Sequence, residues 1–284
     1  MRKLFILGMA FLVSVAMLLT ACKKDDPKPD NGENNNQETP GGGEVTPNQE
    51  YPETAVVLPQ AVTDIDGNTY DAVQIGNQVW MAENLRTTRY ADGTTIPLDS
   101  MYSLTEPYRY APGLNQSNGE NMANVARYGY LYNWPAVMYG ASSSDANPSG
   151  IQGICPNGWH VPSDAEWTPL TDYVSSQSQY VCGGDNTSIA KVLASTTGWN
   201  SSSEPCAVGN NQSSNNATGF SALPAGNYIG YYNHFGSSAI FWSATEDSDY
   251  YDFANCRGFG YYWASVSRCT NLMGSGQSVR CVRD

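Results

Sequence analysis

The chain has 284 residues with 14 Lys and Arg against 27 Asp and Glu, so its net charge at pH 7 is −13. This acidity argues against nucleic-acid binding, which needs clustered positive charge. Aromatic residues make up 12% of the chain, and all seven Trp and all 19 Tyr lie at or beyond Tyr51. That composition supplies a hydrophobic core and excludes global disorder, so we expect one folded domain of about 230 residues.

The first thirty residues predict export and lipid attachment. Two basic residues precede an apolar run from Leu4 to Leu19, which is shorter than the roughly 20 residues that span a bilayer and is typical of a signal peptide. The run ends in Leu19-Thr20-Ala21-Cys22, which resembles the lipobox of bacterial lipoprotein precursors. We therefore expect acylation of Cys22 and anchoring in the outer membrane; an ordinary secretory signal with an incidental cysteine is the alternative.

A flexible tether is expected after the acylated cysteine. Lys23-Lys24-Asp25-Asp26 resembles the lysine-then-acid signal that sends Bacteroidota-type lipoproteins to the cell exterior. From there to Glu50 the chain is rich in Asn, Glu, Pro and Gly, a composition that cannot repay the entropy of folding. The expected organisation is a signal peptide over 1–21, a tether over 22–54 and one folded domain over 55–284.

Six cysteines lie beyond Cys22, and an even number in an exported protein predicts disulfides. Fifteen pairings are possible. Proximity in the sequence favours Cys182 with Cys206 and Cys256 with Cys269. No two of the six have the short C-x₂-C spacing of a zinc site, so metal ligation by thiolates is not expected.

Turn dipeptides divide the start of the folded domain into short strands. Asp66-Gly67-Asn68 and Gly76-Asn77 separate runs that are rich in β-forming residues, which predicts a meander of hairpins. The expected strands are Val62–Ile65, Thr69–Ile75 and Gln78–Met81. Residues 98–150 show little periodicity, so we expect long loops there, with a short helix in 128–139 that is broken near Pro135.

The clearest helix signal follows Pro162. Ser163 stands three residues before Glu166, as in a capping box, and an apolar face continues at helical spacing from Trp167. A second short helix is expected over Ser188–Ala194. The remaining expected strands are Phe220–Leu223, Ala239–Ala244, Tyr250–Arg257, Tyr261–Arg268 and Val279–Val282.

Three blocks of sequence together resemble the Fibrobacter succinogenes major paralogous domain (FISUMP). They are DIDGNTYDAVQIGNQVWMAENL at 64–85, GICPNGWHVPSDAEWTPL at 153–170, and GFSALPAG…FWSATE…SVRCVRD within 219–284. That family is similar in turn to the C-type-lectin-like fold of formylglycine-generating enzymes, whose R-L-P-T-E-A-E-W segment is matched here by residues 160–167. The resemblance implies an α+β domain with small antiparallel sheets, few helices and long loops.

The resemblance also implies a bridge between Cys155 and Cys281, since both lie inside family blocks. It implies no activity, because one fold hosts many functions. A formylglycine-generating oxidoreductase would need a closely spaced cysteine pair for copper, whereas Cys269 and Cys281 have eleven residues between them. We therefore expect no catalysis and no required cofactor.

Other catalytic patterns are weak. The only histidines are His160 and His234, and we interpret the first as a hydrogen-bonded structural residue and the second as a turn residue. No G-x-S-x-G nucleophile motif occurs. Among the carboxylates that glycoside hydrolysis would need, Asp164 and Glu166 are explained by the start of a helix.

Residues 64–71 place oxygen-bearing side chains at alternate positions, which could begin a calcium loop. The candidate ligands are Asp64, Asp66, Asn68 and Asp71. The run lacks the Glu at position twelve of an EF-hand, and a hairpin turn explains Asp-Gly-Asn fully. We therefore favour a turn, with structural calcium as the alternative.

Residues 247–279 have the composition of a binding surface. Nearly half of them are Tyr, Ser, Gly or Asn, which combine aromatic area of low side-chain entropy with adaptable polar groups. A similar C-terminal segment carries the ligand contacts of retroelement-diversified C-type-lectin-like proteins. The alternative is that these aromatic residues simply pack on a core. The candidate binding residues are Tyr250, Tyr251, Asp252, Asn255, Arg257, Tyr261, Tyr262 and Trp263.

Together these patterns predict an outer-membrane lipoprotein that faces the cell exterior and binds a glycan or protein ligand without catalysis. Two other functions are kept open. One is an oxidoreductase of the formylglycine-generating type, and the other is a structural subunit of a surface assembly.

Overall fold

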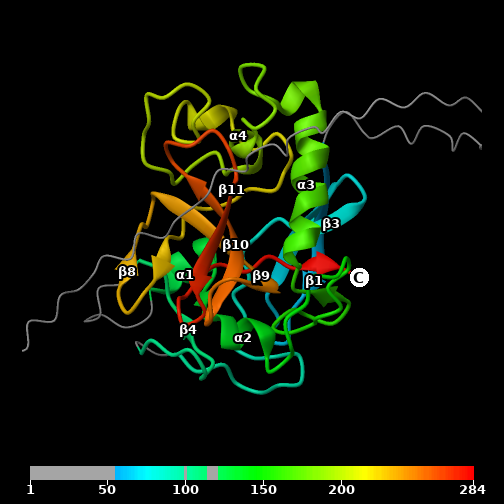
Figure 1. The fold of residues 1–284 in the computed structure, drawn as a ribbon, viewed down its shortest axis with the longest axis vertical. Helices are drawn as coiled ribbons and strands as arrows, with labels where there is room; N and C mark the ends of the chain where they lie inside the picture. Colours follow the sequence, from blue (N-terminus) through cyan, green and yellow to red (C-terminus); the bar gives the residue numbers. More distant parts are fainter. Residues whose placement is uncertain (1–54, 99–100, 114–120) are drawn as a thin grey trace, which may run out of the picture.

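The computed structural model describes residues 55–98, 101–113 and 121–284 (Figure 1). The expected signal peptide, Cys22 and the tether lie outside these residues. The described chain combines few helices with several small antiparallel sheets, so the α+β class is confirmed. Among the described residues, no helix combines the length and the apolar character that a membrane span needs.

The larger sheet has five strands in the order β1-β2-β3-β12-β6. Its members are β1 (Val56–Thr63), β2 (Thr69–Ile75), β3 (Gln78–Met81), β12 (Val282–Arg283) and β6 (Trp159–His160). The meander of hairpins is confirmed, but β1 ends at Thr63 rather than Ile65. Asp64 accepts hydrogen bonds from the backbone N–H groups of Asp66 and Asn68, at 2.9 Å each, and so belongs to the turn.

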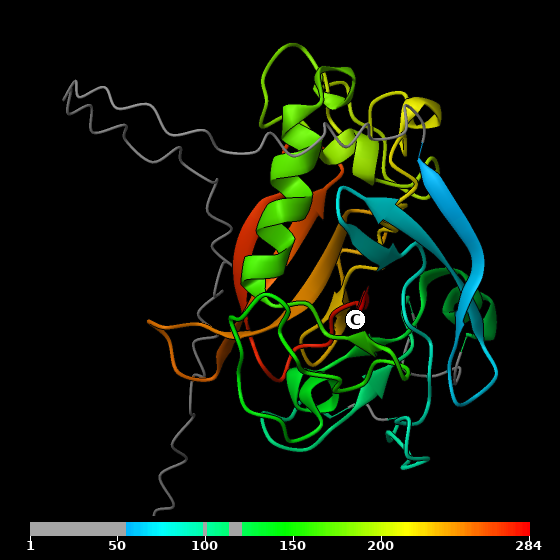
Figure 2. The same ribbon diagram turned by 90° about the vertical axis from the view of Figure 1, so that its right-hand side faces the viewer.

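The second sheet has three strands in the order β11-β10-β9 and is covered on both faces. Its members are β9 (Ser238–Glu246), β10 (Phe253–Gly260) and β11 (Ser267–Leu272). On one face Phe241 and Phe259 pack in the same core cluster as Trp167. Trp167 belongs to α3 (Asp164–Ser176), and Figure 2 shows this helix against the sheet. On the other face Trp242 and Cys256 belong to a separate core cluster.

The capping box of α3 is confirmed: the side chain of Ser163 accepts from the N–H of Glu166, and Glu166 accepts from the N–H of Ser163. The helix expected in 128–139 is the shorter α2, and the expected break at Pro135 is wrong, because Pro135 lies in the first turn, where proline is tolerated. The helix expected over Ser188–Ala194 is shortened to α4. The remaining elements are α1 (Met122–Tyr128), α2 (Trp134–Met138), α4 (Ala190–Leu193), two 3₁₀ turns η1 (Ser178–Tyr180) and η2 (Gln212–Ser214), and two small hairpins that join β4 (Arg109–Tyr110) to β5 (Leu131–Tyr132) and β7 (Asn227–Tyr228) to β8 (Tyr232–Asn233).

Four expected strands were wrong in position or type. In place of Val279–Val282 the structure has β12, which contains only Val282 and Arg283. Residues 220–223 form no ladder beyond one bridge at Ala222, because the carbonyls of Phe220 and Ser221 accept from a buried arginine. Residues 261–266 form the turn that precedes β11, and β10 starts at Phe253 rather than Tyr250. The aromatic pairs at 250–251 and 261–262 therefore lie in turns.

That buried arginine is Arg280, whose side chain is fully enclosed. Its guanidinium donates to Asn84 Oδ1 at 2.7 Å and to the carbonyls of Met81 at 2.9 Å, Phe220 at 2.5 Å and Ser221 at 2.9 Å. The same group lies over the ring of Phe220, 4.7 Å from its centroid. Burial lowers the pKa of Arg280 to about 9, so the side chain is still charged at neutral pH and needs these acceptors.

We expect Arg280→Met to lower the free energy of unfolding by about 3–5 kcal/mol, because it leaves four buried acceptors without their donor. Urea denaturation of the mature, oxidised protein at pH 7 measures this. The matched control is Arg283→Met, since Arg283 is exposed and should tolerate the change. Equal denaturation midpoints for the two variants would show that Arg280 is not needed for stability.

Candidate functional site

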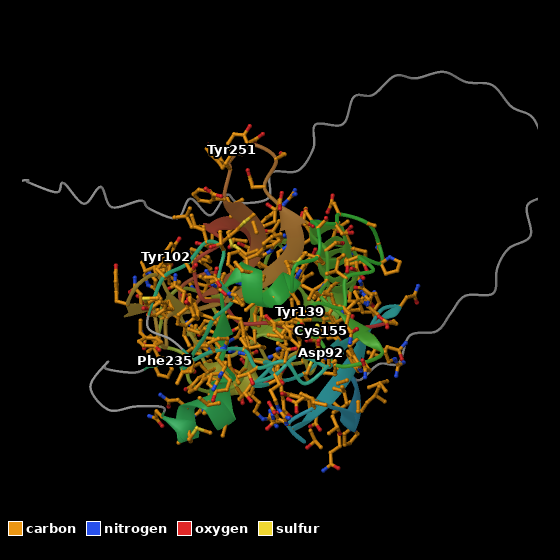
Figure 3. The ribbon with its side chains drawn as sticks, turned by 90° about the horizontal axis from the view of Figure 1, so that it is seen from below. Asp92, Tyr102, Tyr139, Cys155, Phe235 and Tyr251 are labelled. Carbon is orange, nitrogen blue, oxygen red and sulfur yellow. A yellow bond between two sulfur atoms is a disulfide. The ribbon has the colours of Figure 1, made fainter. Side chains whose placement is uncertain are left out.

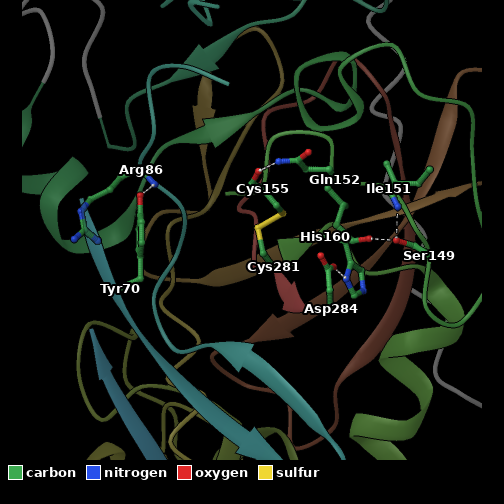
Figure 4. The surroundings of a disulfide bond; sticks show 10 residues. Tyr70, Arg86, Ser149, Ile151, Gln152, Cys155, His160, Cys281 and Asp284 are labelled. Carbon is green, nitrogen blue, oxygen red and sulfur yellow. Dashed lines mark hydrogen bonds and ion pairs between the residues drawn. A yellow bond between two sulfur atoms is a disulfide. The ribbon is translucent and has the colours of Figure 1, made fainter. Parts of the chain in front are cut away.

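All six domain cysteines form disulfides, in the pairs that were expected. The bridge between Cys155 and Cys281 joins Cα atoms 6.0 Å apart and lies beside His160 in Figure 4. The other two pairs, Cys182–Cys206 and Cys256–Cys269, have Cα separations of 5.7 and 5.0 Å. No described cysteine thiol is therefore available as a nucleophile or a metal ligand.

His160 lies between two carboxylates and has little exposed surface. Its Nε2 is 2.7 Å from Glu166 Oε1. Its Nδ1 is 2.7 Å from Asp284 Oδ1, a contact that Figure 4 shows. The second oxygen of Glu166 accepts from the backbone N–H groups of Ser149 and Ser163, at 2.9 and 3.0 Å. Both ring nitrogens are thus engaged within the fold, as a structural histidine requires.

Two opposing effects set the pKa of His160. Burial disfavours the charged ring, but the hydrogen bonds and negative charges of Glu166 and Asp284 outweigh burial and raise the pKa above its ordinary value. A raised folded-state pKa stabilises the protein fully below the pKa of the unfolded chain. That contribution is lost as the pH rises through the folded-state pKa.

We expect the melting temperature to fall as the pH is raised above about 6.5, the ordinary pKa of histidine. His160→Gln should remove this part of the pH dependence, because glutamine does not titrate. Thermal melts across pH 5.5 to 8.5, measured in steps of about half a unit, test this. His234→Gln is the control, since His234 is exposed and should leave the slope unchanged; the same slope in all three proteins would contradict the assignment.

The carboxylates of the candidate calcium ligands in residues 64–71 accept hydrogen bonds from within the protein. Asp64 Oδ2 accepts from the Asn68 amide at 2.8 Å and from the hydroxyl of Tyr70 at 2.5 Å. Asp66 accepts from Arg89 Nε at 2.6 Å and from the N–H of Thr88 at 2.5 Å. Asp71 Oδ1 accepts from the N–H of Gln60 at 2.8 Å, on the neighbouring strand. Ligation of a cation would have to compete with these hydrogen bonds.

We therefore expect that neither millimolar calcium nor EDTA changes the melting temperature of the oxidised protein. Binding of an ion to the folded state alone would raise the melting temperature by mass action. Differential scanning fluorimetry with calcium, with magnesium and with EDTA makes the comparison. A calcium-specific rise that Asp66→Asn abolishes would restore the metal-site interpretation.

The predicted aromatic binding segment does not form one surface. Tyr250 and Tyr251 lie in the turn between β9 and β10, while Tyr261 and Tyr262 lie in the turn between β10 and β11. Because β10 has eight residues, the two turns are separated by about 26 Å along the strand. The segment therefore provides two separate surfaces at opposite ends of the smaller sheet.

Two of the candidate binding residues are buried, which corrects the prediction. Asn255 and Arg257 are 7% and 4% exposed. Arg257 forms an ion pair with Asp164 at the start of α3, and Arg268 Nη2 contacts the other oxygen of Asp164 at 2.6 Å. These charges join the helix to the sheet, and the buried Arg257 is unavailable to a ligand.

The β9–β10 turn, which we call the tip (residues 247–252), is the most exposed part of the predicted segment. Tyr250 is 62% exposed and Tyr251 is 96% exposed, and Figure 3 shows Tyr251 projecting beyond the body of the domain. Asp247 Oδ1 fixes the turn by accepting from the N–H groups of Asp249 and Tyr250, at 2.9 Å each. Asp252 is exposed and takes a positive φ of 63°.

Sequence reasoning missed a neighbour of the tip. Tyr102 is 37% exposed and packs against Gly274, where a Cβ would come within 2.6 Å of its ring. Burial raises the pKa of Tyr102, and the nearby charge of Asp252 raises it further. No local pattern in residues 98–150 indicates that this tyrosine lies beside a turn 150 residues later in the chain.

The β10–β11 turn forms a second, more enclosed aromatic cluster. The ring of Tyr262 lies 5.1 Å from that of Tyr261 and 5.5 Å from that of Trp263, in edge-to-face geometry. Trp263 is half-buried against Gly260, where a Cβ would lie 2.7 Å from its ring. Only Tyr262, at 52% exposure, offers much of its ring to solvent.

A family model describes most of the chain. The model of the Fibrobacter succinogenes major domain matches residues 73–283. The chain belongs to this family. The match lies inside the expected domain of 55–284 and includes the disulfides, the tip and the buried Arg280. No curated protein and no solved structure matches the chain, so the likeness to the C-type-lectin-like fold stays a prediction.

Proposed function

We propose that this member of the family is an outer-membrane lipoprotein that faces the cell exterior and binds extracellular ligands through the tip. Support for the location comes from the lipobox-like end of the signal segment and the polar stretch that follows it. The observation that supports binding is the pair Tyr250 and Tyr251, whose rings are held away from the core. The disulfide-stabilised, C-type-lectin-like domain serves as the rigid base of this surface.

The distribution of reactive groups favours binding over catalysis. An oxidoreductase of the formylglycine-generating type would need free thiols, whereas the six domain cysteines are paired. His160 has both nitrogens engaged. Among the described residues, no three His, Cys, Asp or Glu side chains gather as metal ligands would.

A protein ligand fits the tip better than a glycan does. Tyr251 extends into solvent from a turn, as do the tyrosines that act as anchors in protein interfaces. Residues 246–253 contain four carboxylates and no Lys or Arg, so the partner surface should be neutral or basic. A subunit of a surface assembly would use the same surface with one fixed partner.

We expect the double variant Tyr250→Ser/Tyr251→Ser to weaken ligand binding by tenfold or more, about 1.4 kcal/mol or above, because exposed tyrosine anchors carry much of an interface energy. The mature lipoprotein in detergent is screened against a glycan array, with calcium and with EDTA, and against purified extracellular proteins. Each positive ligand is then titrated against wild type and variants by biolayer interferometry.

Tyr262→Ser is the matched control, because Tyr262 is exposed but lies at the other end of the sheet. Binding of a protein that the tip variant loses and the control keeps would support an adhesin or assembly role. Binding of a glycan with the same dependence would make the tip a lectin surface. The proposal is disproved if the tip variant keeps wild-type affinity for every ligand that the screen finds.

A further inference from the structure

Tyr139 is an exposed tyrosine that lies away from the tip, on a surface that sequence patterns did not indicate. Tyr139 follows the last residue of α2 and lies beside the turn of residues 90–94, which a bridge between Arg89 and Thr95 closes. Figure 3 shows Tyr139 and Asp92 near each other, whereas Tyr251 projects from another edge of the domain. We call Tyr90, Asp92, Thr94 and Tyr139 the platform.

The ring of Tyr139 is held at both its face and its hydroxyl. It stacks on the ring of Tyr90 with 3.6 Å between centroids and 19° between planes. Its hydroxyl donates to Asp92 Oδ2 at 2.7 Å and lies 3.1 Å from Thr94 Oγ1. A ring restrained in this way loses little conformational entropy when a ligand binds, which distinguishes it from the projecting Tyr251.

One side of this restrained ring is open to solvent. Tyr90 is almost fully buried and covers one face of Tyr139, yet Tyr139 is still 43% exposed, so its exposed area comes from the uncovered face and edge. Gly93 and Gly140, which flank the platform, would meet no atom within 4 Å if they carried a Cβ. The surface is therefore uncrowded at these two positions beside the ring.

The backbone of Tyr139 takes a conformation that a bulky residue seldom adopts. Its φ of 50° and ψ of 44° are left-handed, at a position after a helix where glycine is the usual residue. Gly140 follows with a positive φ of 76°. An aromatic residue thus occupies, at the surface, a backbone conformation that favours glycine.

Asp92 supplies a charged acceptor at the margin of the ring. Its carboxylate accepts from the N–H of Thr94 at 2.8 Å and from Tyr139, while the group itself is fully exposed. The bond from the Thr94 backbone, followed by that from Tyr139, lowers the pKa of Asp92, so it stays ionised near neutrality. Each carboxylate oxygen can accept further hydrogen bonds from a ligand.

We infer that the platform binds the pyranose ring of a glycan, with its C–H face on Tyr139 and a hydroxyl group donating to Asp92. An exposed aromatic face buries the apolar side of a sugar, and a neighbouring carboxylate fixes its orientation. An apolar side chain of a protein partner would use the ring but not the carboxylate. This site is independent of the tip and of the function proposed for it.

The test uses the mature lipoprotein in detergent and four soluble neutral hexasaccharides, built from glucose, mannose, galactose or N-acetylglucosamine. Titration calorimetry measures affinity, and the near-ultraviolet difference spectrum reports whether a tyrosine ring is stacked. Tyr139→Ala should weaken the best hexasaccharide at least about tenfold, whereas Tyr139→Phe, which keeps the ring, should weaken it only a few-fold. The tip variant Tyr250→Ser/Tyr251→Ser should bind it like wild type.

Asp92→Asn keeps the test decisive if Tyr139→Ala fails to fold. The Oδ1 of asparagine can still accept from the N–H of Thr94, and the amide nitrogen that replaces Oδ2 can donate to the Tyr139 hydroxyl oxygen while that hydroxyl donates to Thr94 Oγ1. The ring should therefore stay in place while the charged acceptor is lost. We expect this variant to melt like wild type and to bind the hexasaccharide several-fold more weakly. The inference is overturned if wild type binds none of the four at millimolar concentration, or if folded Tyr139→Ala and Asp92→Asn bind as wild type does.

Discussion

The described structure depends on one buried positive charge. The Arg280 guanidinium is not exposed to solvent. Its N–H groups donate to carbonyl and amide oxygens of two other regions of the chain. Met81 and Asn84 belong to the first family block, and Phe220 belongs to the third. A desolvated guanidinium tolerates this environment only when its N–H groups are satisfied, so the position of each of these segments is constrained by the same group.

The residues after Arg280 extend this constraint to the middle block. Cys281 is bonded to Cys155, Val282 pairs with both Trp80 and His160, and Asp284 contacts the ring of His160. Five consecutive residues therefore connect β3, β6 and the loop before β6. A short strand with only two ladder residues is stable here because a covalent bond, a buried charge and an ion pair support it together.

The features that were predicted correctly from the sequence are those whose interacting residues lie close together in the chain. The first two hairpins and the capping box of Ser163 and Glu166 depend on residues within four positions of one another, and they were predicted correctly. The aromatic segment was predicted wrongly, because residues rich in Tyr and Phe resemble a strand even when their tyrosines lie in turns. The burial of Arg257 depends on Asp164, 93 residues earlier, and the platform joins residues 47 apart. No window of sequence contains both partners.

The smaller sheet also has a consequence for how this domain can change over evolutionary time. Both faces of β10 are packed, so substitutions within the strand disturb one core or the other. The turns at its two ends carry exposed rings on backbone that the sheet already holds in place. Substitutions in widely separated turns change the free energy of unfolding additively. A change in one turn therefore does not need a compensating change in the other. Selection can therefore diversify each turn of this protein independently while the core that supports both stays the same.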